Sequence, residues 1–248
     1  MRISRLAVLA VTVVATSAAV AESASVAVAA NFLNTMSALI EDFGNEHEIK
    51  LISGSTGGLY AQIVNGAPYD IFVAADSERP RLLGESGLGV ADTRFTIARG
   101  RLVLWSAVRE LSGSTDFRSL FSDDIRHLAI ANPELAPYGV AARQTLVGLG
   151  LWEAFATRLV HGTSVAQAYA LAATGNAELG LVAEAQVLGA DAPGTFVRVP
   201  ERLYEPIDQD AILLKRGAGN AAATELFEFL SSEQAKARIR AAGYGVPD

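Results

Sequence analysis

Apolar segments alternate with amphipathic ones along the first third of the chain. Residues 25–30 are small, β-branched and apolar, which is typical of a strand buried on both faces of a parallel sheet, and residues 69–74 are predicted to form another buried strand. Between them, apolar residues recur at helical spacing over 36–43, a strand is expected at 49–52, and a helix opens at Leu59. Three strand–helix alternations in a row predict an α/β fold with helices on both faces of a mainly parallel sheet.

The same alternation continues through the rest of the chain. Further strands are predicted at 102–105, 128–131, 179–182, 196–199 and 211–214, and further helices near 139–149, 165–174 and 222–240. No internal repeat or low-complexity tract is visible after residue 21. The pattern alone is compatible with one sheet or with two smaller ones.

The first 21 residues have the three regions of a secretory signal peptide. Arg2 and Arg5 form a basic start, residues 6–14 are apolar, and the small residues of 19–21 predict cleavage before Glu22. The apolar run is too short to cross a bilayer comfortably, and no later stretch approaches the ~20 apolar residues that a membrane helix needs. We therefore expect 1–21 to be removed and the mature protein to be exported, against the alternative of a buried or anchoring helix.

Composition and charge remove several classes of function. The chain contains no cysteine, which excludes disulfides, thiolate catalysis and cysteine-bound metals. Two of its 20 basic residues lie in the leader, so 18 face 27 acidic residues in the mature chain, a net charge of −9. Such a chain is a poor candidate for binding nucleic acid or an anionic membrane.

Catalytic motifs are missing as well. His47, His127 and His161 are scattered and share no metal-ligand spacing. The chain has no G-x-S-x-G, S-x-x-K, Walker A or G-x-G-x-x-G pattern in the required context. The acidic residues with any claim to acid–base chemistry are Asp70, Asp76, Asp123 and Asp124, and we interpret them as solvated loop or strand-end carboxylates. The sequence thus predicts no catalytic residue.

Four strand-to-helix turns are rich in small, neutral hydrogen-bond donors. They are residues 30–32, 55–58, 137–139 and 163–165. A helix start exposes unpaired N–H groups and the positive end of its dipole, so each turn is a potential anion site. The simpler interpretation of any one turn is ordinary helix capping. Gly57 and Gly58 weaken a helix start, which favours a close approach to the backbone there, and Tyr138 is an unusual residue for a plain cap.

Several segments resemble periplasmic molybdate-binding proteins of ABC transporters. The resemblance rests on residues 28–33, 54–63, 65–76, 131–139 and 205–210, with the run Gly-Ala-Pro-Tyr-Asp-Ile-Phe-Val-Ala-Ala-Asp as its most specific part. It implies two α/β lobes joined by crossing strands, with the ligand in the cleft between them. The expected lobes are 22–103 with 207–248, and 104–206.

In that family, molybdate or tungstate is held by backbone N–H groups and neutral hydroxyls without a basic counter-ion. A fully deprotonated oxyanion needs only donors, whereas phosphate or arsenate would bring a proton that faces them. Sulfate, which has the same charge and shape, would have to be excluded by size. The molybdenum would be present only within the oxyanion, with no direct bond to the protein, and no cofactor is expected.

The resemblance also implies which residues bind. Asn31 would donate its main-chain N–H, with its side-chain amide as a further candidate. Ser55 or Thr56 would donate a hydroxyl and an N–H, and Tyr138 and Val165 their main-chain N–H groups.

This chain departs from some members of the family at two positions, the first of which is Asn31, where those members have serine. Some members of the family have a ligand-contacting tyrosine where this chain has Ala183. Two interpretations remain open: Tyr138 supplies the missing phenol from another turn, or Tyr138 only closes the cleft.

The resemblance further implies a monomer in the periplasm that delivers its ion to a membrane permease with its ATPase. Two alternatives stay open. The same fold could bind sulfate, chromate or another tetrahedral oxyanion, or the chain could be a secreted hydrolase on the same scaffold, since fold does not settle function. A sensory or adhesion module is a weaker third.

Overall fold

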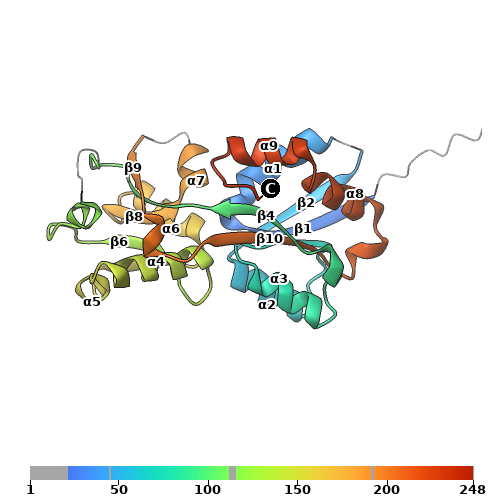
Figure 1. Ribbon diagram of the computed structural model, residues 1–248, viewed down its shortest axis with the longest axis horizontal. Coiled ribbons are helices and arrows are strands. Elements are labelled where there is room, and N and C mark those ends of the chain that lie inside the picture. Colours follow the sequence, from blue (N-terminus) through green and yellow to red (C-terminus); the bar gives the residue numbers. More distant parts are fainter. Residues whose placement is uncertain (1–21, 45, 112–115, 191–192, 248) are drawn as a thin grey trace, which may run out of the picture.

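The computed structural model describes residues 22–44, 46–111, 116–190 and 193–247. It consists of two lobes, each built on a five-stranded sheet flanked by helices (Figure 1). The predicted signal peptide, 1–21, lies outside the described residues. No helix in the described part of the chain is both long enough and apolar enough to cross a membrane.

The first lobe contains both ends of the described chain. Its sheet has the order β2 (Glu48–Gly54), β1 (Ser23–Ala29), β3 (Ile71–Val73), β10 (Ile207–Leu213) and β4 (Phe95–Gly100). Its helices are α1 (Leu33–Phe43), α2 (Thr56–Val64), α3 (Glu78–Glu85), α8 (Ala221–Leu230) and α9 (Glu233–Ala241), with short 3₁₀ turns η1 (Ala30–Phe32), η2 (Ala91–Thr93) and η5 (Gly217–Gly219). Only β10 runs against the other four strands.

The second lobe repeats this arrangement. Its sheet has the order β7 (Leu159–Gly162), β6 (Leu128–Ala131), β8 (Leu179–Ala183), β5 (Leu102–Ser106) and β9 (Thr195–Arg198), and only β5 is antiparallel to the rest. Its helices are α4 (Pro137–Gly148), α5 (Trp152–Phe155), α6 (Val165–Ala173) and α7 (Glu184–Leu188), with 3₁₀ turns η3 (Phe117–Leu120) and η4 (Glu201–Leu203). The prediction of two mainly parallel α/β sheets is therefore confirmed.

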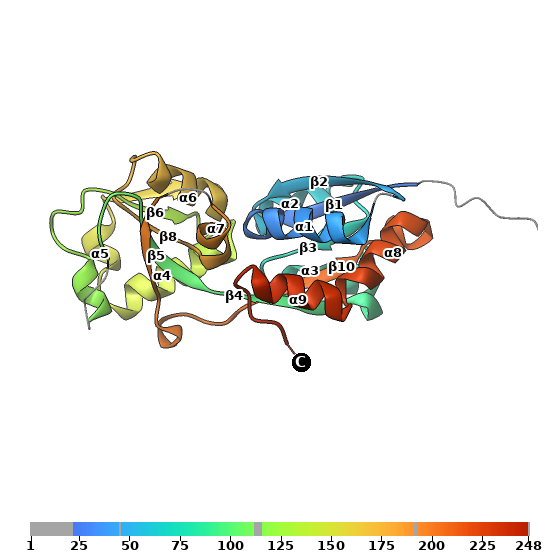
Figure 2. The same ribbon diagram turned by 90° about the horizontal axis from the view of Figure 1, so that it is seen from above.

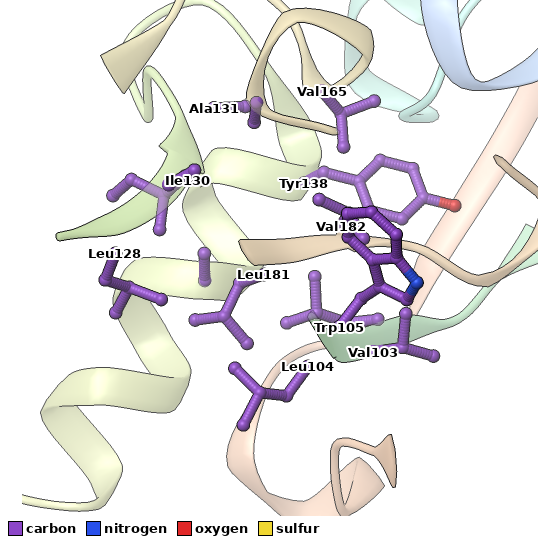
Figure 3. Close-up of a cluster of buried hydrophobic side chains, with 14 of the residues drawn as sticks. Val103, Leu104, Trp105, Leu128, Ile130, Ala131, Tyr138, Val165, Leu181 and Val182 are labelled. Carbon is purple, nitrogen blue, oxygen red and sulfur yellow. The ribbon is translucent and has the colours of Figure 1, made fainter. Parts of the chain in front are cut away.

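Side-chain alternation along the strands explains why helices cover both faces of the first sheet. Val26 and Val28 of β1 pack with α1, α8 and α9, whereas Ala27 packs on the other face with α2 and α3 (Figures 1 and 2). The second lobe has a single large cluster, in which Trp105 and Leu181 are fully buried (Figure 3). Each lobe thus has its own hydrophobic core.

Two segments carry the chain between the lobes (Figure 1). The first runs from β4 to β5 through Arg101, and the second runs from β9 to β10. The predicted boundary after residue 103 falls inside β5, because Leu102 and Val103 already pair with β8 of the second sheet. The change of lobe therefore occurs before β5 begins, at Gly100–Arg101.

The end of the chain returns to this crossing. Arg99 on β4 and Gly245 exchange two backbone hydrogen bonds, of 2.7 and 2.9 Å. Tyr244, 3% exposed, packs in the core of the first lobe. The C-terminal residues thus line the outer edge of a connecting strand.

One helix prediction was wrong in extent. Residues 222–240 were expected to form a single helix, but α8 ends at Leu230 and α9 begins at Glu233. The side chain of Ser232 accepts a hydrogen bond from the Ala235 N–H, which caps the start of a new helix. The break places α8 and α9 separately against the first sheet and α1.

Candidate functional site

A small cavity lies between the lobes, where the carboxyl ends of the parallel strands meet. It is lined by Ala29, Ala30, Asn31, Gly54, Ser55, Thr56, Ala75, Ala136, Pro137, Tyr138, Ser164 and Val165. All five predicted site residues are in this set, two of the four turns coming from each lobe. The carboxyl edge of an α/β sheet is where such folds hold ligands.

Three of the four turns place a helix start at the cavity, and the fourth places a 3₁₀ turn there. β1 leads directly into η1, β2 into α2, β6 through a short loop into α4, and β7 into α6. In each case the first N–H groups of the helical segment have no partner within it. The positive ends of three helix dipoles and several backbone donors therefore surround one space.

Among the residues that the structure describes, none with a charged side chain lines this cavity. The ion pair of Asp76 with Arg79 instead lines a larger neighbouring cavity of about 300 Å³ that shares Ala75 and Pro137 with the small one. Burial raises the pKa of the Asp76 carboxyl despite its hydrogen bonds to Arg79. The small cavity therefore presents neutral hydrogen-bond donors, and the charged side chains of Asp76 and Arg79 lie outside it.

The two candidate hydroxyls keep a proton to donate. Ser55 caps α2 by accepting a 3.3 Å hydrogen bond from the Gly58 N–H, and Thr56 Oγ1 accepts one of 2.9 Å from the Ala75 N–H. In both cases the hydrogen bond from the backbone N–H uses a lone pair of the hydroxyl oxygen and leaves the O–H hydrogen for another acceptor. Thr56 is 1% exposed, and Ser55 is partly buried.

The side-chain amide of Asn31 is already hydrogen-bonded within the protein and does not supply a donor to the cavity. Its Nδ2 donates to Gln209 Oε1 at 2.9 Å and to the Tyr244 hydroxyl at 3.1 Å. The Tyr244 hydroxyl in turn donates to the Asn31 carbonyl at 2.8 Å. Both amide hydrogens thus have acceptors, and the main-chain N–H is the donor that Asn31 can offer a ligand.

The Tyr138 hydroxyl lies at the strand crossing. Gln209 Nε2 donates to it at 3.3 Å, and a Cβ added to Gly100 would come within 2.2 Å of it. Figure 3 shows the hydroxyl pointing away from the buried side chains of the second lobe. Burial raises the pKa of this phenol well above its usual value, so it stays protonated. Ala183, where a tyrosine was noted in the family, is buried and is not among the residues that line the cavity.

The turn before α6 contributes Val165 and a residue that sequence reasoning did not single out, Ser164. Ser164 caps α6 by accepting a hydrogen bond from the Gln167 N–H, and Val165 is the first helical residue. Thr163, in contrast, donates both its N–H and its hydroxyl to Gln167 Oε1. A serine just before a predicted helix was the available signal for Ser164.

At Gly57 of the glycine pair, the expected close approach to the backbone is made by the other lobe. The Gly57 N–H donates to the Leu135 carbonyl of the other lobe at 2.9 Å, and a Cβ on Gly57 would lie 2.9 Å from that oxygen. A Cβ on Gly58 would lie 2.9 Å from Ser55 Oγ. Gly57 therefore allows the lobes to touch, and Gly58 leaves room for the capping serine.

The described residues contain no group of three or more acids and histidines that could hold a metal ion. Besides Asp76, two of the four acidic residues considered above for acid–base chemistry form ion pairs. Asp70, which is buried and not solvated as expected, pairs with Arg216 and accepts from the Ser25 N–H at 2.8 Å, and Asp124 pairs with Arg109. The prediction of a solvated carboxylate was therefore wrong for Asp70.

Comparisons with known proteins agree with this arrangement. Residues 24–245 match the family described as bacterial extracellular solute-binding protein. The chain is 47% identical over 235 residues to the molybdate-binding protein ModA of Azotobacter vinelandii, covering 92% of each, and 42% identical over 220 residues to that of Rhodobacter capsulatus, covering 88% of this chain and 86% of the relative.

Solved structures give the same picture. The periplasmic molybdate-binding protein of Azotobacter vinelandii superposes with a TM-score of 0.85 at 40% identity, covering 91% of this chain and all of that one. The sulfate-binding protein SubI of Mycobacterium tuberculosis, at 16% identity and a TM-score of 0.76, covers 92% of this chain and 88% of its own, and shows the shared fold alone.

Proposed function

The chain belongs to the bacterial extracellular solute-binding protein family, and from this premise we propose that it binds molybdate between its two lobes. The observation that carries the proposal is the small cavity, where turns from both lobes present N–H and O–H donors and no charged side chain. The relatives at 47% and 42% identity carry the name molybdate-binding protein. The role is capture and transport of the ion, not catalysis.

The proposed ligand set follows from the free donors at the cavity. Asn31, Tyr138 and Val165 donate main-chain N–H groups, and Ser55 and Thr56 donate hydroxyls together with their N–H groups. A dianion held by both lobes gains all of these contacts only when the lobes are closed, so binding favours closure. Helix dipoles and donors replace a basic counter-ion.

The size of the cavity bears on how the ion enters. Its volume of about 10 Å³ is near the minimum for one water molecule. A tetrahedral oxyanion is larger than that, so the lobes must separate to admit it before they close around it. Size is then the means of distinguishing molybdate from sulfate, while phosphate and arsenate are disfavoured because their proton would face donors.

We infer that tungstate, which has the charge and shape of molybdate, binds at the same site. Titration calorimetry with purified protein tests both ions, with sulfate as a competitor. The expected result is one site per chain for molybdate and tungstate and little displacement by sulfate. Tight sulfate binding with no molybdate binding would reassign the ligand.

A thermal-shift series gives an independent test. Only an ion that binds the folded chain raises its melting temperature by mass action. Molybdate and tungstate should stabilise, whereas phosphate, sulfate and chromate should not. If no oxyanion stabilises the protein, the proposed function fails and the hydrolase alternative returns.

The remaining parts of the proposal concern the setting in the cell. We propose that residues 1–21 are cleaved on export to the periplasm, and that the monomer delivers its ion to a membrane permease with its ATPase. N-terminal sequencing of the exported protein should then begin at Glu22. Sedimentation should give a single species of one chain, and a dimer would contradict the proposal.

A further inference from the structure

A chain of buried polar groups joins the two walls of the cavity through the strand crossing. It runs from Tyr138 on α4 to Gln209 on β10, then to Asn31 in η1 and Tyr244 near the C-terminus. These four residues are at most 4% exposed. Two of them, Tyr138 and Asn31, lie in binding turns of opposite lobes, and the group between them is the side-chain amide of Gln209.

Both ends of the Gln209 amide are used. Its Oε1 accepts from Asn31 Nδ2 at 2.9 Å, and its Nε2 donates to the Tyr138 hydroxyl at 3.3 Å. A side chain that accepts at one end and donates at the other fixes which way each neighbour points. An apolar residue of similar length could fill the space but would leave Asn31 and Tyr138 with unpaired buried groups, which is costly.

The backbone around Gln209 is shaped for this contact. Gln209 is fully buried, and the pairing of β10 with β4 shifts register immediately after it, between Gln209 and Asp210. On β4, a Cβ at Gly100 would lie 2.7 Å from Gln209 Nε2 and 2.2 Å from the Tyr138 hydroxyl. The absence of a side chain at Gly100 therefore leaves the room in which Gln209 and Tyr138 meet.

We propose that Gln209 is a positioning residue for ion binding, which holds the Asn31 turn of one lobe and the Tyr138 turn of the other in the arrangement that binds the ion. This inference rests on the proposed function. Gln209 is not among the residues that line the cavity, so it is not part of the proposed ligand set. It acts by fixing the main-chain donors on either side, so its loss weakens binding without removing a ligand.

The first test replaces Gln209 by methionine, which has a similar length and no hydrogen-bonding amide. We expect Gln209→Met to fold and to bind molybdate about tenfold or more weakly in titration calorimetry, as loss of a buried hydrogen-bonded pair predicts. Gln62→Met is the matched control, because Gln62 also bonds a tyrosine hydroxyl, Tyr69, at 2.6 Å, but is exposed and lies outside the cavity.

The second test uses Gln209→Glu and varies pH. A protonated glutamic acid can accept from Asn31 and donate to Tyr138, as the amide accepts and donates, whereas a carboxylate adds a negative charge beside a bound dianion. Burial raises the pKa of a carboxyl group, in some cases to about 8–9. The titratable groups in the same hydrogen-bonded chain are the phenols of Tyr138 and Tyr244, whose pKa values burial raises, so they stay neutral. Tyr204 and Glu184 are close enough to Tyr138 to raise the pKa of its phenol further.

We therefore expect Gln209→Glu to bind weakly at about pH 9 and to recover affinity towards pH 6 relative to the wild type at each pH. A merely structural role would not give this recovery. Wild-type affinity in Gln209→Met, or no recovery of affinity in Gln209→Glu, would overturn the positioning role of Gln209 and leave the proposed function intact. If the wild type binds sulfate in place of molybdate, the same comparison is made with sulfate, and a wild type that binds no oxyanion overturns the inference together with the proposed function.

Discussion

Gly57 of the first lobe donates its N–H to the carbonyl of Leu135 in the second lobe at 2.9 Å. This backbone hydrogen bond lies beside the cavity, because Gly57 follows Ser55 and Thr56, and Leu135 precedes the first residues of α4. A side chain at Gly57 would press on that carbonyl from 2.9 Å. Closure of the cleft therefore depends on the smallness of a residue that does not itself line the cavity.

Gly57→Ala should weaken molybdate binding by about tenfold, or ~1.4 kcal/mol, because its methyl group meets backbone atoms that cannot move aside easily. Gly219→Ala is the control, since a Cβ there has open space around it. Titration calorimetry compares the two. Equal affinity in Gly57→Ala and the wild type would show that the closed form tolerates a wider cleft.

Ser55→Ala should affect both stability and binding. Losing the cap of α2 costs about 0.5–2 kcal/mol of folding stability, and losing the hydroxyl removes a donor to the ion, for an affinity loss of about tenfold. Ser232→Ala removes an equivalent cap from α9, outside the cavity. Thermal melts should show a similar loss for both variants, and calorimetry a weaker affinity only for Ser55→Ala. Equal affinities would assign the donor role to Thr56.

Tyr138→Phe distinguishes the two roles left open for the phenol. Its recorded hydrogen bond is to Gln209, so we expect a severalfold loss of molybdate affinity, by way of the unpaired Gln209 amide. A loss of about a hundredfold, or ~2.7 kcal/mol, would instead mean that the phenol binds the ion directly. Unchanged affinity would mean that Tyr138 only closes the cleft.

Stability should fall at high pH because of two buried phenols. Burial raises the pKa of Tyr138 and Tyr244 above the ordinary value of about 10. Above that pH the unfolded chain releases protons that the folded chain keeps, so the free energy of unfolding decreases, by up to about 1.4 kcal/mol per pH unit for each phenol. Below pH 10 these phenols contribute no pH dependence.

Denaturant titrations between pH 9 and pH 11 measure this slope. Tyr244→Phe should make it shallower than in the wild type, and Tyr60→Phe, which changes a partly exposed ring, serves as the control. An unchanged slope in Tyr244→Phe would show that the buried phenol does not govern alkaline unfolding.

Local pattern was enough for most of the strands and for the helix starts that build the cavity. The apolar segments that became β1 and β6 and the serines before α2 and α6 all carry their signal within a few residues. Strands β4 and β7 and helices α3, α5 and α7 were not predicted. Strand β4 is held by pairing with β10, more than a hundred residues away. The pair of serines before α9 was a local signal that the prediction passed over.

Long-range contacts account for what the sequence could not reveal at the site. A glycine is needed at position 57 because the Leu135 carbonyl, 78 positions later in the chain, lies against it. The orientation of the Asn31 amide is set by Gln209, 178 positions away. No periodicity or motif reports such distances. Residue pattern identified the turns and the family resemblance implied which of their residues bind, but only the folded chain shows which of their side chains are already hydrogen-bonded.

The pairing of Gly245 with Arg99 has a practical consequence for making the protein. A purification tag fused directly to the last residues would lie beside Tyr244 and the edge of strand β4, which leads from one lobe to the other. Such a tag could therefore change the ion binding that is to be measured. The start of β1 lies at the far end of the first lobe from the second (Figure 1). Affinity handles, surface immobilisation and fluorophores are therefore better attached ahead of Glu22.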